Sequence, residues 1–292
     1  MMTASCLVGG NMLRTIRGLA FTIPVLSILA LGGCSHTGDS DDPAAQQPEE
    51  QPVELIYNQA ADALDARQYR EATRLFEDVE RQHPYSQWAT RAELMAAYAS
   101  YKDQRYDEAV LALDRFAELH PGNKDVDYAL YLRALCFYEQ ISDVARDQAI
   151  TMESLQAFEA LTRRFPDSPY SRDANLKLDL IRDHLAGKEM EIGRYYLNRG
   201  QVNAAINRFV TVVKNFQTTT HVPEALHRLV EAYLTLGLKD EATRIAAVLG
   251  YNYPGSKWYG YSYKLLDPDQ RRKIVEDRNW LDKTVDSLFK PD

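Results

Sequence analysis

Apolar residues recur at helical spacing along most of the chain, from Val53 to about Pro254. An apolar residue at every third or fourth position forms a stripe on one face of an α-helix, whereas alternation at every second position would indicate a strand. No strand-like alternation persists, and the prolines of this region lie almost entirely at the junctions between apolar stretches. The pattern predicts an all-α protein.

One short motif repeats along this region in a single register. It has a small residue, an apolar residue four positions later, a second apolar residue three positions further on, and then a proline after five more. In the fourth copy, Gln217 takes the place of the proline. The motif resembles the second helix of a tetratricopeptide (TPR) unit, where the small residue lets two helices approach closely. Its five copies begin at Ala72, Ala109, Ser154, Ala205 and Ala242.

The five copies predict five TPR-like helix pairs, over residues 53–84, 86–121, 124–166, 169–217 and 222–254. One pair cannot bury its apolar face alone, so consecutive pairs are expected to stack into a helical-repeat superhelix with a binding face. Some copies lie further apart than the roughly 34 residues of an ideal TPR. We assign the extra residues to a polar loop at 142–150 and to one long helix from Ser171 to Arg199. Gly200 and Gly237 each precede a second helix and predict turns with positive φ.

The N-terminus has the features of a secretion signal. Residues 1–33 contain two basic residues, no acidic residue, and an apolar run that ends in Leu31-Gly32-Gly33-Cys34. This ending resembles the bacterial lipoprotein box, whose cysteine receives fatty acids such as palmitate. We therefore predict a signal peptide at 1–33, lipidation at Cys34, and a flexible polar tether at 34–52. An ordinary signal peptide is the alternative, and Met12 is an alternative start.

Composition and motifs argue against several functions. The 42 acidic and 34 basic residues give a net charge of −8, which disfavours nucleic acid as a partner. The six histidines form no ligand pair, and the chain has no phosphate-binding loop and no nucleophile motif. Cys136 is the only cysteine after Cys34 and lies in an apolar pattern, so we expect it in the core. We predict a binding protein without enzymatic activity, cofactor or metal.

Three tyrosines and the C-terminal region are further candidates for binding. Tyr57, Tyr128 and Tyr131 lie outside the strict packing register, so they are candidates to line a peptide-binding face. Residues 255–292 form an aromatic and amphipathic extension. Within it, one helical face is expected to dock as a cap on the last repeat or to bind a partner, and its apolar residues are Ile274, Leu281, Val285 and Leu288.

Several longer strings resemble the BamD (ComL) family of outer-membrane lipoproteins, which belong to the β-barrel assembly machinery. The resemblance extends from Cys34 to about Pro254. The strings that carry it contain charged residues that a generic TPR does not require. The most specific strings are AVLALDRF at 109–116, DYALYLRAL at 127–135, FPDSPY at 165–170 and AINR at 205–208.

The resemblance implies a five-TPR scaffold that binds the POTRA domains of the barrel subunit BamA. It implies that Arg208 pairs with a carboxylate of that partner, and that the N-terminal repeats face unfolded outer-membrane proteins. It also implies contacts with smaller assembly lipoproteins and a lipid-anchored location on the periplasmic face of the outer membrane. The alternatives are a periplasmic TPR protein that coordinates envelope constriction with peptidoglycan synthesis, and an export-system lipoprotein.

Overall fold

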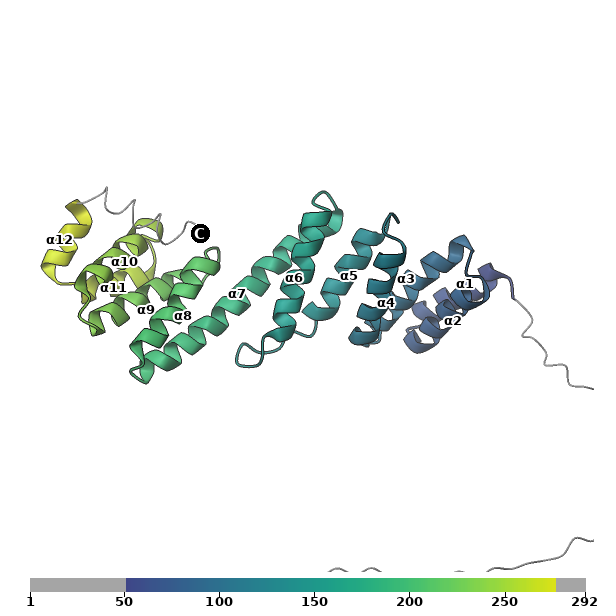
Figure 1. Cartoon of the computed structure of the whole chain (residues 1–292), viewed down its shortest axis with the longest axis horizontal. Helices are drawn as coiled ribbons and strands as arrows, with labels where there is room; N and C mark the ends of the chain where they lie inside the picture. The colour runs from purple at the N-terminus through teal and green to yellow at the C-terminus, as the bar shows by residue number, and fades with distance from the viewer. Residues whose placement is uncertain (1–50, 277–292) are drawn as a thin grey trace, which may run out of the picture. The chain divides into compact units, whose positions relative to one another are not determined.

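A computed structural model of the chain describes residues 51–276, which contain helices and no strands. The predicted signal peptide, Cys34 and nearly all of the tether lie outside the described residues, as do Leu281, Val285 and Leu288. From α1 to α11, each helix packs against the next along the chain (Figure 1). The helices are α1 (Val53–Asp65), α2 (Tyr69–Gln82), α3 (Gln87–Lys102), α4 (Tyr106–Leu119), α5 (Val126–Tyr138), α6 (Ala149–Arg164), α7 (Pro169–Asn198), α8 (Val202–Asn215), α9 (Val222–Thr235), α10 (Lys239–Asn252), α11 (Lys257–Leu265) and α12 (Pro268–Glu276).

The repeated motif marks the core of the fold. Its small and apolar positions lie on α2, α4, α6, α8 and α10, and each is at most 1% exposed. Four copies contribute a phenylalanine whose full burial stabilises the fold by about 1.5–3 kcal/mol. The all-α helical-repeat fold predicted from the sequence is confirmed. The four rings are those of Phe76, Phe116, Phe158 and Phe209.

Ser154 occupies the small position of the third motif copy, and it predicts a gain in stability. The residue is fully buried, and its hydroxyl has no hydrogen-bond partner among the described residues. Ser154→Ala is expected to raise the free energy of unfolding by about 1 kcal/mol, because it removes a desolvated hydroxyl that bonds to nothing. Thermal unfolding followed by circular dichroism measures this change. Ser171→Ala is the matched control and should destabilise the protein, because the buried Ser171 hydroxyl donates to the Phe165 carbonyl at 2.6 Å. An unchanged or lower melting temperature for Ser154→Ala contradicts the prediction.

The turns inside four helix pairs share one geometry. Gly200 and Gly237 have φ values of 72° and 75°, which confirms the predicted positive φ. Arg67 and Gln104 occupy the corresponding position in the first two pairs, each with φ 61°. In each turn the following residue donates its N–H to a carbonyl in the last turn of the first helix, at 2.8–3.0 Å. A residue in this left-handed conformation is a common way to end a helix, and non-glycine residues adopt it only at some cost in energy.

The long helix predicted between the third and fourth motif copies is confirmed as α7, with 30 residues and a length of about 45 Å. Ser168 caps its start by accepting a hydrogen bond from the N–H of Tyr170. The first half of α7 contributes Leu178 and Ile181 to a core shared with α5 and α6. Its second half contributes Met190 to a different core, shared with α8, α9 and α10. The helix is long because it belongs to two consecutive packing units.

The connection between α5 and α6 spans 139–148. It begins three residues before the polar loop expected at 142–150 and ends two residues before it. The side-chain amide of Gln148 donates to the carbonyl of Arg146 at 3.0 Å. Lys188 of α7 donates to the carbonyl of Ala145 at 2.9 Å. The first bond lies within the loop, and the second fastens the loop to α7.

The described part of the C-terminal extension packs on the last helix pair. Helix α11 lies against α9 and α10, and α12 lies against α10. Leu266 is 2% exposed and belongs to the last core, against which Ile274 also packs. This packing agrees with the cap that the sequence offered as one alternative. Between residues 51 and 276, no helix combines the length and the apolar character needed to cross a bilayer.

Candidate binding surfaces

Five half-buried tyrosines lie on α3, α5 and α7, the first helices of three consecutive pairs; we call them the tyrosine face. Their rings approach one another closely. The Tyr98 and Tyr101 centroids are 6.4 Å apart, and the Tyr170 ring lies 5.2 Å from both Tyr128 and Tyr131. The phenolic Oη of Tyr131 donates to a carboxylate oxygen of Asp173. The tyrosine face consists of Tyr98, Tyr101, Tyr128, Tyr131 and Tyr170.

Burial keeps the hydroxyls of Tyr101, Tyr128 and Tyr131 protonated. It raises the pKa of Tyr101 to about 12, and it also raises the pKa values of Tyr128 and Tyr131. The neutral hydroxyls can both donate and accept hydrogen bonds, while the rings present apolar surface. This combination suits the backbone and side chains of a bound peptide.

The three candidate tyrosines are not equivalent in the structure. Tyr128 and Tyr131 lie together on the tyrosine face, joined by Tyr170. Tyr57 is only 7% exposed and packs in the first core, 5.3 Å from Phe76 between ring centroids. It therefore offers little surface to a peptide, and its ring instead supports the Arg91 guanidinium at 5.7 Å.

Helix α7 also carries two exposed leucines. Leu176 and Leu180 are 63% and 60% exposed and are one helical turn apart. They form a small exposed apolar patch on one side of α7, among charged residues that include Asp179 and Asp183.

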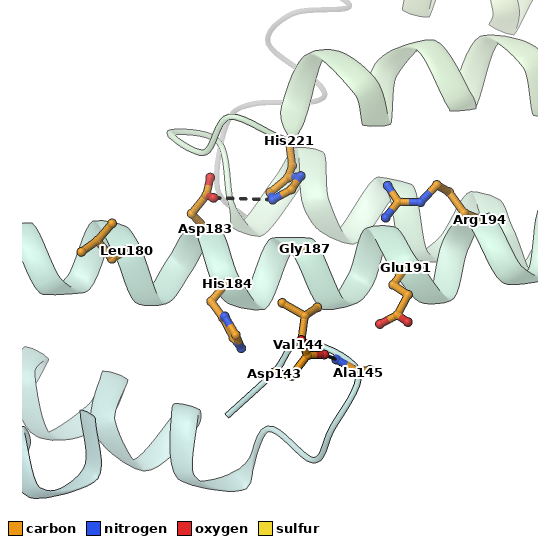
Figure 2. A pocket seen from close by; sticks show the side chains of 10 residues that line it. All are labelled: Asp143, Val144, Ala145, Leu180, Asp183, His184, Gly187, Glu191, Arg194 and His221. Carbon is orange, nitrogen blue, oxygen red and sulfur yellow. Dashed lines mark hydrogen bonds and ion pairs between the residues drawn. The ribbon is translucent and has the colours of Figure 1, made fainter. Parts of the chain in front are cut away.

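A pocket of about 480 Å³ lies further along the same side of α7 (Figure 2). Gly187 is at its centre: a Cβ there would lie 3.3 Å from His221 Nε2 and 3.8 Å from Val144 Cγ1. His221 pairs with Asp183 at 3.5 Å, and Asp183 also accepts hydrogen bonds from the N–H and hydroxyl of Thr220. The charged groups of the pocket thus hold α7 to the start of α9.

A second pocket, of about 520 Å³, lies between α3 and the loop that precedes α5. Arg91 and Lys124 both line it, and the buried residues Leu94 and Phe116 contribute apolar surface. Neither cation has an ion-pair partner among the described residues, although Asp125 also lines the pocket. We call it the cationic pocket. Sequence inspection did not find it, because its two cations come from segments that only the fold brings together.

Arg208, the predicted partner-binding residue, lies on α8 and is paired within the chain. Its guanidinium donates to both carboxylate oxygens of Glu189 on α7, at 3.1 and 3.3 Å, and its side chain is 42% exposed. Glu189 is nine positions after Leu180, which at about 100° per residue places the two on opposite sides of α7. Arg208 is therefore reached from the side of α7 opposite Leu180.

Two groups with catalytic appearance have structural roles instead. Ser262 Oγ is 2.8 Å from His227 Nδ1, and His227 Nε2 is 3.4 Å from Glu231, but Ser262 is fully buried and holds α11 to α9. Cys136 is 0% exposed, as predicted, and burial raises the pKa of its thiol to about 12. Within residues 51–276, no three His, Cys, Asp or Glu side chains are grouped so that they could hold a metal ion.

Comparison with known proteins identifies the family. A family model described as "Outer membrane lipoprotein" matches residues 49–249. A relative from Caulobacter vibrioides is 50% identical over 267 residues, which cover 91% of this chain and 87% of the relative. A relative from Rickettsia prowazekii is 48% identical over 238 residues, covering 82% of this chain and 92% of the relative. Both are named outer membrane protein assembly factor BamD.

Among solved structures, the chain is similar to a thermophilic TPR protein of Thermus thermophilus, with 17% identity and a TM-score of 0.34. That similarity covers 77% of this chain and 97% of the other. The match to the family model is more informative than this similarity, because it extends from α1 into α10. The chain therefore belongs to the BamD family of outer-membrane lipoproteins.

Proposed function

We propose that this protein is a non-enzymatic scaffold of outer-membrane β-barrel assembly, lipid-anchored through Cys34 on the periplasmic face of the outer membrane. On the side of α7 that carries the Arg208–Glu189 pair, it binds the POTRA domains of a BamA-like barrel protein. On the tyrosine face it binds unfolded outer-membrane proteins, and smaller assembly lipoproteins join the same complex. Family membership supports the assembly role.

The lipid anchor is tested by labelling cells with palmitate. The wild type should incorporate the label, and Cys34→Ser should not.

The observation that carries the substrate role is the tyrosine face together with the cationic pocket. Half-buried tyrosines lose little conformational entropy on binding and offer both apolar and polar contacts to an extended chain. Arg91 and Lys124 line one pocket, whose lining also includes the buried residues Leu94 and Phe116. That chemistry suits a peptide that ends in an aromatic residue with a free carboxylate, because the guanidinium pairs with the carboxylate and the half-buried tyrosine rings offer apolar contact to the aromatic side chain.

Removing the pocket's cations is therefore expected to weaken peptide binding. Arg91→Ala with Lys124→Ala should lower the affinity for a peptide with an aromatic, free C-terminus by roughly tenfold to hundredfold. Each charge-assisted hydrogen bond contributes about 1.5–3 kcal/mol, and the cost of desolvating the charges offsets part of this gain. Fluorescence anisotropy of a labelled peptide measures the change. The same peptide with an amidated C-terminus is the control, and it should bind the wild type and the variant with similar affinity. If the variant binds both peptides more weakly by the same factor, the two cations do not recognise the C-terminal carboxylate.

The internal pair of Arg208 decides how the partner contact is tested. Because Glu189 already neutralises Arg208, a partner carboxylate either shares the guanidinium or displaces Glu189. A guanidinium has five N–H donors and can serve two carboxylates at once. With a side chain 42% exposed, Arg208 retains free surface for the second.

Arg208→Ala is accordingly expected to release the POTRA-bearing partner, with a loss of at least tenfold in co-purification from solubilised outer membrane. Glu189→Gln is the matched control: it removes the same internal ion pair but keeps the arginine, so the partner should remain bound. Mass spectrometry of the stoichiometric partners gives the readout. If both variants lose the partner, the pair acts by holding α7 to α8; if neither does, the contact lies elsewhere.

A further inference from the structure

Helix α11 has an outer face with cationic and aromatic side chains. Lys257, Tyr261 and Lys264 follow one another at spacings of four and three residues and are exposed, with the exposed Gly260 between them and Leu265 at the edge. Tyr261 and Leu265 are each 48% exposed. The nine residues of α11 include no acidic side chain, although the whole chain has a net charge of −8. We call this surface the α11 face.

Cations also lie over the aromatic rings of α11. The Lys257 ammonium and the Arg228 guanidinium lie 5.0 and 5.7 Å from the centroid of the Trp258 ring. The Arg271 guanidinium lies 4.9 Å from the Tyr263 ring. Cations over aromatic rings are held close to the ring surface.

The carboxylates of this region do not neutralise the two lysines. Asp267 pairs with Lys239 at 3.1 Å, and Glu231 pairs with Arg228 at 2.8 Å. Among the described residues, neither Lys257 nor Lys264 lies within ion-pair distance of a carboxylate. Within residues 51–276, no carboxylate neutralises their charge.

The α11 face is held rigidly on the last helix pair. The bond between Ser262 and His227 ties α11 to α9. On the α10 side, the Tyr259 ring packs against Gly250, where a Cβ would lie 2.5 Å from ring carbon Cε2. All of α11 lies beyond residue 249, where the match to the family model ends. The face is thus a fixed surface added to the part of the fold that the family model describes.

We propose that the α11 face contacts the surface of an anionic lipid bilayer. Tyrosine and tryptophan favour the interface between lipid headgroups and water, where lysines reach anionic headgroups. Each lysine or arginine near an anionic membrane contributes about a fivefold gain in binding, equivalent to about 1 kcal/mol. The chain belongs to a family of outer-membrane lipoproteins, and its acidic remainder is repelled by the same lipids. The α11 face would therefore orient the last repeat toward the membrane.

The test uses residues 50–292, which leave out the predicted lipid site and contain the compact unit of helices between residues 51 and 276. The probes are vesicles of phosphatidylethanolamine with phosphatidylglycerol, compared with vesicles of phosphatidylcholine alone, and co-sedimentation measures the bound fraction. The wild type should bind only the anionic vesicles. Lys257→Gln with Lys264→Gln should reduce that binding by about 30-fold, from about 1 kcal/mol for each lysine. Circular dichroism checks that the variant is folded.

Lys102→Gln with Lys214→Gln is the matched control, because it removes the same charge from exposed sites on α3 and α8. It should leave vesicle binding almost unchanged. An equal loss in the control would mean that net charge alone drives adsorption, and it would overturn the proposal. If the wild type does not bind anionic vesicles, the proposal is also overturned. The α11 face would then be a candidate to bind an acidic protein surface. Neither result bears on the scaffold function, since no assembly partner is present in this experiment.

Discussion

Gly193→Ala is expected to lower the free energy of unfolding by about 1–2 kcal/mol, although alanine is the better helix former. A Cβ at this position of α7 would lie 2.4 Å from Cε1 of Phe209 and 2.9 Å from two further ring atoms. Phe209 is 0% exposed in the core between α7 and α10, so its ring has no free space to move into. Overpacking of this kind typically costs about 1–3 kcal/mol and exceeds the propensity gain of about 1 kcal/mol.

Gly260→Ala is the control for this prediction, because Gly260 also lies inside a helix but a Cβ there would meet nothing within 4 Å. It should stabilise the protein by up to about 1 kcal/mol. Adding Phe209→Leu to Gly193→Ala should recover part of the loss, since the smaller side chain makes room. Urea unfolding of the four proteins gives the comparison. A Gly193→Ala protein as stable as the wild type would show that α7 and α8 separate easily.

Phe158→Ala is expected to lower the free energy of unfolding by about 3–5 kcal/mol, the range for truncating a fully buried aromatic ring. Phe158 is 0% exposed at the centre of the core shared by α5, α6 and α7. Its ring also lies 6.1 Å from Tyr131 and 6.2 Å from Tyr138. The cavity left by the substitution would therefore lie directly beneath part of the tyrosine face.

This position links stability to peptide binding. If the variant is still folded at low temperature, its peptide affinity should fall as well, because Tyr131 loses the ring that supports it. Leu111→Ala is the control: Leu111 is on α4 and is 72% exposed, so its truncation should change the unfolding free energy by less than about 0.5 kcal/mol. Denaturant unfolding and peptide anisotropy are measured on the same samples. If the Phe158→Ala protein loses stability but keeps full peptide affinity, Phe158 does not support peptide binding through Tyr131.

The candidate surfaces were only partly predictable. Tyr128 and Tyr131 were selected because they lie outside the packing register, and the structure places both in one aromatic group with Tyr170. Tyr57 also lies outside the packing register, yet it is 7% exposed, because Phe76 of α2 and Trp88 of α3 pack against its ring. The register of one helix indicates which residues can face the core, but the neighbouring helices decide whether the others are covered.

The family resemblance selected Arg208, but not its internal partner. Glu189 precedes Arg208 by nineteen residues and lies on another helix, so no local spacing connects them. The cationic pocket was missed for a similar reason, since Arg91 lies on α3 and Lys124 lies in the loop after α4. Both features matter for experiments, because they determine the control for each substitution.

The sequence by itself determined the helices, the repeat register and the buried motif positions, from Ala72 in the first copy to Leu249 in the last. These features depend on the periodicity of residues within one or two helical turns, which can be read locally. Only the packing of the helices shows that α7 is shared by two cores, that Glu189 pairs with Arg208, and that the lysines of α11 have no carboxylate partner between residues 51 and 276. Those features depend on side chains that are far apart in the sequence and meet only when the helices pack.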